Sequence, residues 1–329
     1  MNKLTSNRKF QYGRRPPKRH VAIQLRDVLT GVVPAHPVSE DYLNNVSGWK
    51  ILGNDNFSDC LAVAWANMRY FITSMLTDHP YYPTLEQVYE IYKTQNPGFV
   101  PDPNNPVDDN GMDIQTLCEY LTKNAGPDGA KLIGFASVDV TNLNEVKAAL
   151  AIFGCLMLGI EVQETNIQDF NNGQPWNYHP GDTIDGGHAV LAGGYLTTPG
   201  NDVRFITWAQ QTGMTDAFWN NLVARSNTGE GWVCIWEENL GTKAFQEGIN
   251  LQTLAADYQA LTDRPFPVPV PTPTPIPTPT PAPVPNPVPT PTPVPTPSPL
   301  IPPAPPAGGV AWAIEFLEWL ITFLKNIWS

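Results

Sequence analysis

The chain has few cysteines and few histidines. Its 329 residues include five histidines and four cysteines, which are Cys60, Cys118, Cys155 and Cys234. No two cysteines have CxxC spacing and no cluster of cysteine and histidine has the spacing of a zinc site, so we expect neither a metal nor a cofactor. Cys118 and Cys155 lie in apolar runs and are expected in the core, and a domain this long needs no disulfide framework.

The N-terminus lacks an apolar signal segment, and the first 26 residues lack acidic side chains. Residues 1–26 carry eight of the 19 Lys and Arg residues. The rest of the chain has the other 11, together with all 31 Asp and Glu residues. We therefore expect a solvated basic arm over residues 1–26. Eight charges alone do not form a nucleic-acid-binding motif, so nucleic acid is not expected as a partner. Without a signal peptide, synthesis is expected in the cytoplasm, with later association with a virion or a membrane surface as further options.

Residues 265–308 are almost entirely proline with threonine, valine, alanine and isoleucine. Proline stands at every odd position from Pro265 to Pro299. Because proline has a fixed φ and no backbone donor, this stretch is expected to be an extended linker, about 130 Å long at full extension. It separates residues 27–264, which are long enough for one large domain, from residues 309–329.

Residues 309–329 predict an amphipathic helix. Its polar positions, among them Glu315, Glu318 and Lys325, fall on one narrow stripe, and bulky apolar residues cover the rest. The uncharged run between Glu318 and Lys325 is too short to span a bilayer. Three functions stay open for this helix, namely binding to a membrane surface, self-association, and docking into the groove of a partner protein.

The spacing of apolar residues changes along residues 27–264. Spacings of three and four predict helices first, at 59–77, 84–94 and 113–124. Strands are predicted later, at 130–140, 155–162, 188–196 and 204–208, with helices at 144–153 and 216–224 and a polar loop at 163–185. Helices followed by strands indicate an α+β fold rather than alternating βαβ units.

Cys60 and His188 form the strongest candidate for a chemical site. Cys60 stands at the start of the predicted helix 59–77, where unpaired N–H groups stabilise a thiolate, although the neighbouring Asp59 opposes this by its charge. His188 follows two glycines and begins a buried strand, which would hold the imidazole rigidly. A thiol and an imidazole are the nucleophile and the general acid/base of amide hydrolysis. The backbone N–H of Cys60 and the amide of Asn54 are expected to stabilise the oxyanion.

The segments around these two residues resemble papain-like cysteine peptidases. Residues 54–60 are similar to that family's loop before the nucleophile, with Asn54 in place of the family's glutamine, and residues 185–195 are similar to its histidine strand. Trp208 matches a tryptophan that follows the family's orienting asparagine. Ile206 occupies the asparagine position, so the resemblance implies another orienting residue, either Thr207 or Gln210, and we favour Thr207.

A closer resemblance is to a group of papain-like proteins in bacteria, phages and prophages. That group has an Asn-Asp-x-x-Gly-Asp-Cys loop, in which Ser58 here replaces the glycine, together with a Gly-Gly-His strand and a Thr-Trp strand. The resemblance covers roughly residues 12–225. It implies a papain-like α+β fold with an N-terminal helical half carrying Cys60 and a C-terminal antiparallel sheet half carrying His188.

Two functions therefore stay open. The first is a cysteine peptidase or amidase that cleaves peptide or protein substrates, with Cys60, His188, Asn54 and Thr207 as its site residues. The second is a catalytically inactive papain-fold module that serves as a structural or binding part of a phage particle or surface assembly.

Residues 108–113 are acidic but lack the spacing of a calcium loop, so a solvated turn is expected there.

Overall fold

The computed structural model describes residues 11–17, 23–31, 35–198, 200, 202–225, 229–266 and 270, with only the backbone for residues 261 and 262. These residues all belong to the first of two compact units, Met1–Thr272. The predicted linker at 265–308 lies almost wholly outside the described residues, and the predicted helix at 309–329 lies wholly outside them, so both stay predictions. Among the helices in the described ranges, none has the length and apolar character needed to cross a bilayer.

Three helices form the first half of the fold. They are α2 (Cys60–Leu76), α3 (Leu85–Lys93) and α4 (Ile114–Lys123), and they confirm the helices predicted at 59–77, 84–94 and 113–124. Side-chain caps determine where two of them begin. Thr84 and Gln87 form a reciprocal capping box at α3, and Asp113 accepts a hydrogen bond of 2.7 Å from the Thr116 N–H at α4.

One antiparallel sheet forms the second half of the fold. Its strands are β2 (Gly134–Val138), β3 (Leu156–Gln163), β4 (Ile184–Tyr195), β5 (Val203–Thr207), β6 (Gln210–Met214) and β7 (Glu230–Ile235), in the order β2-β7-β3-β4-β5-β6, with β1 (Glu40–Asp41) pairing with β4. The strand predicted at 188–196 is part of β4, which runs beside β3 and β5 near the middle of the sheet.

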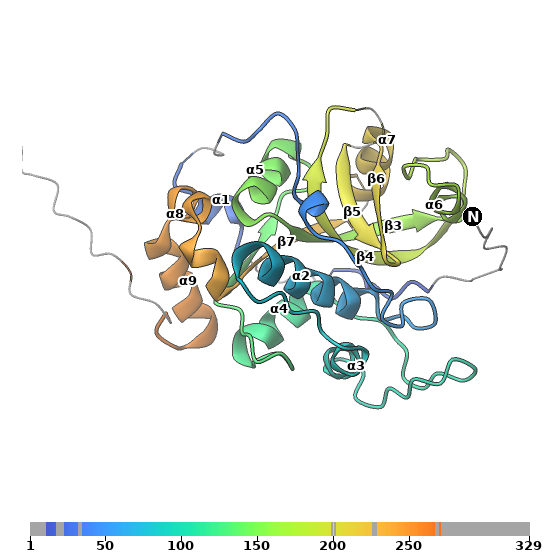
Figure 1. Cartoon of the computed structure of the whole chain (residues 1–329), viewed down its shortest axis with the longest axis horizontal. Coiled ribbons are helices and arrows are strands. Elements are labelled where there is room, and N and C mark those ends of the chain that lie inside the picture. The colour runs from blue at the N-terminus through green and yellow to red at the C-terminus, as the bar shows by residue number, and fades with distance from the viewer. Residues whose placement is uncertain are drawn as a thin grey trace, which may run out of the picture. The chain divides into compact units, whose positions relative to one another are not determined.

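The sheet has an apolar core on each face. On one face α2, α3 and α4 pack against alternate residues of β4 such as Ala189 and Leu191. On the other face Val190 packs with α5 (Leu143–Phe153) and the segment after β6. Figure 1 shows α2 lying along the sheet with α3 and α4 beyond it. Because side chains of a strand alternate between its faces, His188 projects toward the same face as Val190.

The remaining elements are short helices and turns, together with the longer helix α9. They are α1 (Leu25–Val28), η1 (Tyr42–Asn45), α6 (Asn166–Asn171), α7 (Asp216–Phe218), the π-helical turn η2 (Trp219–Val223), η3 (Glu237–Gly241), α8 (Lys243–Gly248) and α9 (Leu251–Thr262). The loop predicted at 163–185 is wrong in part, because it contains α6. Tertiary contacts explain this helix, since the Asn166 side chain accepts from Gln163 N at 2.9 Å and donates to Asn177 O at 2.7 Å.

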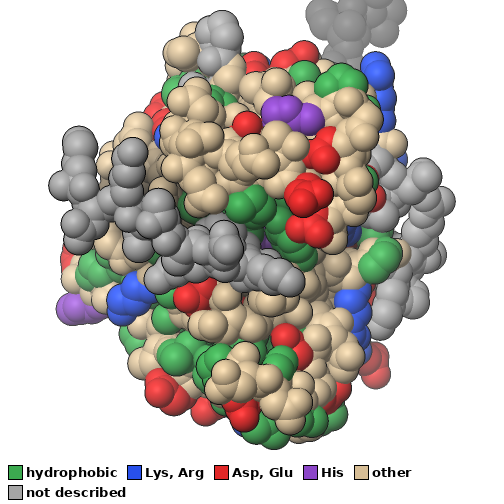
Figure 2. All heavy atoms as spheres, turned by 90° about the vertical axis from the view of Figure 1, so that its right-hand side faces the viewer, with side chains coloured by type: hydrophobic (Ala, Val, Ile, Leu, Met, Phe, Trp, Pro, Cys, Tyr) green, Lys and Arg blue, Asp and Glu red, His purple; other side chains and the backbone are tan. Residues whose placement is uncertain are grey.

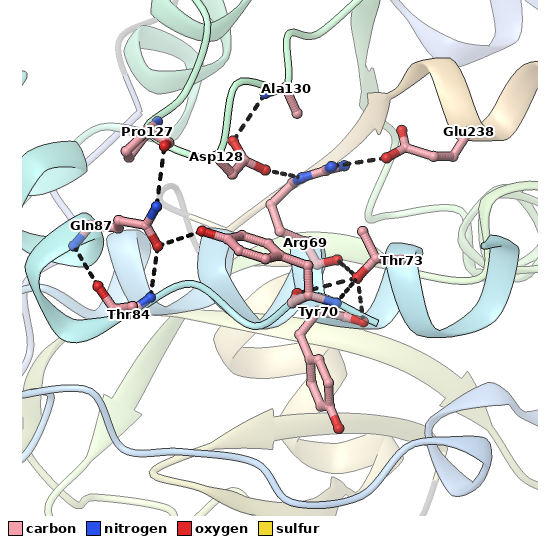
Figure 3. A network of polar contacts seen from close by, with 10 residues as sticks. Arg69, Tyr70, Thr73, Thr84, Gln87, Pro127, Asp128, Ala130 and Glu238 are labelled. Carbon is pink, nitrogen blue, oxygen red and sulfur yellow. Dashed lines mark hydrogen bonds and ion pairs between the residues drawn. The ribbon is translucent and has the colours of Figure 1, made fainter. Parts of the chain in front are cut away.

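Arg69 ties the middle of α2 to the sheet half of the fold. Its Nε lies 2.6 Å from Asp128 Oδ2 and one terminal nitrogen lies 2.8 Å from Glu238 Oε1. The guanidinium also lies 4.3 Å from the centre of the Trp236 ring. Figure 3 shows the arginine between the two carboxylates. This network restrains α2, and therefore the residue at its first position, relative to the segments that follow α4 and β7.

Candidate active site

Cys60 is the first residue of α2 and touches the sheet. Its side chain is 1% exposed, and its Sγ accepts a hydrogen bond of 3.4 Å from the backbone N–H of Ala189 on β4. A second backbone N–H, that of Gly13, also favours the thiolate over the thiol. The start of α2 therefore places the sulfur beside the residue that directly follows His188, which brings the two halves of the predicted pair together.

His188 uses one ring nitrogen to bind Thr207. Its Nε2 lies 2.8 Å from Thr207 Oγ1, and both side chains are buried. Its Nδ1 is buried and has no hydrogen-bond partner among the described residues. The Thr207 contact orients the ring and leaves Nδ1 as the nitrogen that can exchange a proton with a thiol.

The alternation of β5 explains why Thr207 makes this contact. Ile206 packs with Leu191 and Ala189 in the core beside α2, so it projects to the opposite face from His188. Thr207, one residue further, projects to the same face as the imidazole. Gln210, the other orienting residue considered from the sequence, is exposed at the start of β6.

Two tryptophans enclose the imidazole. The Trp208 ring stacks on His188 with centroids 4.9 Å apart, and the Trp176 ring lies 6.3 Å away. Trp208 and Ala209 form the two-residue turn between β5 and β6, with φ values of 42° and 64°. Positive φ at both positions is typical of a tight hairpin turn and is unusual for residues other than glycine. This turn directs the indole back over the histidine and shields its contact with Thr207 from water.

Asn54 lies in the loop that precedes α2. Its side chain is buried, and Nδ2 donates a long hydrogen bond of 3.4 Å to the Phe57 carbonyl within the same loop. The amide therefore lies close to the start of α2 and already has an acceptor. Its predicted part in stabilising an oxyanion stays a prediction.

Asp59 is fully buried beside Cys60. Burial is the main cause that raises the pKa of its carboxyl well above the ordinary range, and the nearby Asn54 side chain offsets only part of that shift. Burial thus favours the neutral form of Asp59. A neutral carboxyl opposes a thiolate far less than the charged group expected from the sequence.

Residues 11–17 lie across the site as an extended segment. The Arg14 N–H donates to the Gly187 carbonyl at 2.9 Å, the Met112 N–H donates to the Gly13 carbonyl at 2.7 Å, and the Arg15 N–H donates to the Met112 carbonyl at 2.8 Å. The segment thus binds both halves of the fold at once. We call residues 11–17 the cleft segment.

The cleft segment is not the solvated arm expected from the sequence. Arg14 is buried, and a terminal nitrogen of its guanidinium lies 3.2 Å from Glu230 Oε1. The prediction of a solvated arm is therefore wrong for Arg14. Arg14 and Glu230 are 216 positions apart, and neither carries a local pattern that would have paired them.

Burial changes the protonation of Cys60 and His188. Burial raises the pKa of Cys60 to about 11. Burial and the charge of Arg14 lower the pKa of His188 to about 3. Near pH 7 these shifts favour a neutral thiol and a neutral imidazole, and this is a weakly nucleophilic state.

Asp109 is a further residue that positions the site. Its carboxylate accepts hydrogen bonds from the Ser58 N–H at 2.9 Å and the Tyr92 hydroxyl at 2.7 Å. The solvated turn expected at residues 108–113 is therefore wrong for Asp109, which holds the loop before Cys60. In the described part of the chain, no three His, Cys, Asp or Glu side chains form a group that could hold a metal ion.

A cavity of about 880 Å³ borders the cleft segment. The acidic residues that line it, Asp109, Glu164 and Asp185, come from the body of the fold, whereas its basic lining residues, Arg14 and Arg15, come from the cleft segment. Figure 2 views the α6 side of the molecule and shows acidic side chains gathered on its upper part. The acidic side chains at this cavity therefore belong to the body of the fold, and the basic ones belong to the cleft segment.

The fold is similar to that of solved cysteine proteases. Xylellain, a cysteine protease from Xylella fastidiosa, matches 70% of this chain and 98% of its own, with 18% sequence identity and a TM-score of 0.52. Procathepsin B from Trypanosoma congolense (12% identity, TM-score 0.44, 69% of this chain and 87% of its own) and procathepsin L2 from Tenebrio molitor (15%, 0.41, 62% and 70%) match less well. No protein-family model matches the chain, and no curated protein matches it. The likeness to xylellain shows that the chain has the papain-like α+β fold predicted from its sequence.

Proposed function

We propose that the chain is a cysteine peptidase or amidase that hydrolyses peptide-type amide bonds. The observation that carries this proposal is the placement of the Cys60 thiol at the start of α2, against the strand that holds His188. The hydrogen bond between His188 Nε2 and Thr207 Oγ1 supports it, because a catalytic imidazole needs a fixed tautomer and orientation.

The reaction would follow from these positions. Cys60 Sγ attacks the carbonyl carbon as its proton passes to His188, and the Cys60 N–H and the Asn54 amide stabilise the oxyanion. His188 then protonates the amine as the C–N bond breaks, which leaves a thioester on the sulfur. Water, deprotonated by His188, hydrolyses the thioester and restores the thiol.

The cleft segment would have to move before this reaction could occur. The segment reaches the thiol through the Gly13 N–H, and burial of the site is the main cause of both pKa shifts. Readmitting water would move the pKa of Cys60 down and that of His188 up, because burial disfavours the charged form of each. We therefore propose that the protein is a latent hydrolase with residues 11–17 in place.

An electrophilic peptide probe tests this function in the full chain. Gly13→Ala is used to displace the cleft segment, and labelling is compared with chains that also carry Cys60→Ala or His188→Ala. We expect the probe to label Cys60 in the Gly13→Ala chain, no label after Cys60→Ala, and a large loss after His188→Ala. Equal and slow labelling of all four cysteines in the Gly13→Ala chain would contradict the proposal.

A second function is supported by the same cleft segment. Its hydrogen bonds to both halves of the fold and the buried Arg14–Glu230 pair also suit a papain-fold module that never opens. Such a protein would serve as a structural or binding part of a phage particle or surface assembly, displayed on the linker at 265–308 and attached through residues 309–329. Cleavage of a peptide by the Gly13→Ala chain, lost after Cys60→Ala, would exclude it.

A further inference from the structure

Arg14 occupies a pocket built for its side chain. The guanidinium donates hydrogen bonds to Glu230 Oε1 at 3.2 Å and to the Ile160 carbonyl at 3.3 Å. Glu230 in turn accepts a hydrogen bond of 2.7 Å from the Trp232 indole, which fixes the second carboxylate oxygen. The acceptors belong to the neighbouring strands β3 and β7, so the rigid sheet itself forms the bottom of the pocket.

Glycines make room for the arginine stem. A Cβ on Gly159 would lie 2.6 Å from Arg14 Cδ and 2.8 Å from Glu230 Cγ, and a Cβ on Gly187 would lie 2.5 Å from the Arg14 carbonyl oxygen. Any side chain at these two positions would therefore close the passage between the cleft and Glu230. The pocket depends on both glycines as much as on its acceptors.

We infer that this pocket is a substrate subsite for an arginine side chain, with Glu230 as its specificity-determining residue. The inference rests on the proposed function, because it assigns part of the substrate to the same cleft. Arg14 would hold the position that an arginine of a peptide substrate takes once the cleft segment has left.

The backbone contacts favour a peptide as the occupant. Arg14 belongs to an extended segment, and its backbone N–H donates to the carbonyl of Gly187, the residue directly before His188. That carbonyl is equally available to the backbone of an incoming peptide. The substrate residue whose side chain occupies the pocket would therefore lie one or two positions from the scissile amide bond at Cys60.

The charges favour arginine over other side chains. Burial raises the pKa of Glu230, whereas the Trp232 hydrogen bond and the Arg14 guanidinium lower it. A cation in the pocket therefore stabilises the charged carboxylate that would bind it. Two acceptors, one charged and one neutral, suit the planar guanidinium better than a compact ammonium. The acidic residues Asp109, Glu164 and Asp185 on the cavity wall would also attract a basic peptide.

Turnover in an opened full chain tests the subsite. The opened chain carries Gly13→Ala and Arg14→Ala, and its substrates are fluorogenic peptides with arginine, lysine, norleucine or glutamate at each of three positions before the cleaved bond. At one position we expect arginine to exceed norleucine in kcat/KM by at least about tenfold, with lysine between them. Glu230→Gln should bring that ratio close to one. Glu247→Gln removes the same charge from exposed α8 and should leave the ratio unchanged.

A binding measurement keeps the two proposals separate. Cys60→Ala is added to the opened chain, and calorimetry compares tripeptide amides that differ only in a central arginine or norleucine. We expect the arginine peptide to bind at least about tenfold more tightly, and Glu230→Gln to remove the difference. If the opened chain does not fold, Arg14→Ala alone replaces both substitutions, since it removes the guanidinium and its stem from the pocket while Gly13 keeps its native conformation.

The outcomes differ for the subsite and for the enzyme. Arginine-selective binding without any turnover would support the subsite and contradict the proposed function. Turnover without an arginine preference, or a preference that Glu230→Gln does not reduce, would overturn the subsite and leave the function standing. Absence of both binding and turnover would overturn both.

Discussion

Thr207 Oγ1 lies 2.8 Å from His188 Nε2, on the side of the imidazole away from the nitrogen left for Cys60. A threonine hydroxyl thus holds the ring where the resemblance to papain-like peptidases would place an asparagine one position earlier. The hydroxyl can accept the N–H of a charged imidazolium, which favours the charged form.

Thr207→Val should lower kcat/KM of the Gly13→Ala chain by roughly tenfold to a hundredfold, because it leaves a buried N–H without an acceptor. The alkaline limb of the pH–rate profile should also move to lower pH, since the imidazolium loses its hydrogen bond. Thr207→Ser keeps the hydroxyl and is the control. An unchanged profile with Thr207→Val would show that the contact does not orient a catalytic group.

Gly13→Ala should expose Cys60 to reagents. A Cβ at Gly13 would lie 1.7 Å from the Ser58 carbonyl oxygen, a distance that the backbone cannot accommodate, so the cleft segment must leave. As water returns, the pKa of Cys60 falls from about 11, and each unit of that fall increases the thiolate fraction at pH 7 about tenfold. Iodoacetamide labelling followed by mass spectrometry of each cysteine measures the rate.

Gly31→Ala is the matched control for that experiment, because a Cβ at Gly31 would meet nothing within 4 Å. Cys118, Cys155 and Cys234 are buried in the core and should stay slow in both chains. If Gly13→Ala leaves the rate at Cys60 unchanged while the chain stays folded, the cleft segment does not limit access to the thiol.

Asp59→Asn should make the fold more stable at neutral pH. The folded-state pKa of Asp59 lies above its unfolded value because of burial, so the wild-type fold binds a proton that the unfolded chain has released. Its contribution is fully present below the unfolded pKa and is lost as the pH rises toward the folded pKa. Within that window the wild type should lose about 1.4 kcal/mol per pH unit relative to Asp59→Asn.

Urea unfolding of both chains between pH 4 and pH 8 measures this difference. The free energies of unfolding should converge toward pH 4 and separate as the pH rises. Asp55→Asn, one turn away in the same loop but only partly buried, should show little such trend. Parallel curves for wild type and Asp59→Asn would mean that Asp59 is charged in the fold.

Arg69→Met should destabilise the protein by about 3–5 kcal/mol, because it leaves the buried Asp128 carboxylate without its cation. Urea unfolding at pH 7 is the measurement. Lys243→Met breaks an exposed ion pair with Glu247 and should change the free energy of unfolding by less than about 0.5 kcal/mol. A small effect of Arg69→Met would show that α2 does not depend on this network.

The sequence predicted the parts of the site that have local signals. Cys60 follows a loop rich in asparagine and aspartate and opens a helix with regular apolar spacing, and His188 follows two glycines and begins an apolar strand. Thr207 was favoured over Gln210 from the sequence, and the alternation of β5 explains why its side chain reaches His188. The same kind of signal predicted α2, α3, α4, β3 and β4 to within a few residues.

The sequence could not predict contacts whose partners are far apart in the chain. Glu230 has no feature of its own that indicates an arginine pocket, and Asp109 looks like one acidic turn residue among several. The helix α6 was missed because buried hydrogen bonds of Asn166, rather than apolar spacing, stabilise it. The prediction for residues 11–17 used only their charge, and charge does not reveal that Arg14 is buried.

The cleft segment is part of the same polypeptide as the cleft, joined through α1 to the body of the fold. A tethered ligand of this kind competes at an effective concentration on the order of millimolar, whatever the concentration of the protein. Dilution therefore cannot release it, and a free peptide must outbind it or wait for the chain to be cut. The timing of any activity would then be decided by events at the N-terminus rather than by the supply of substrate.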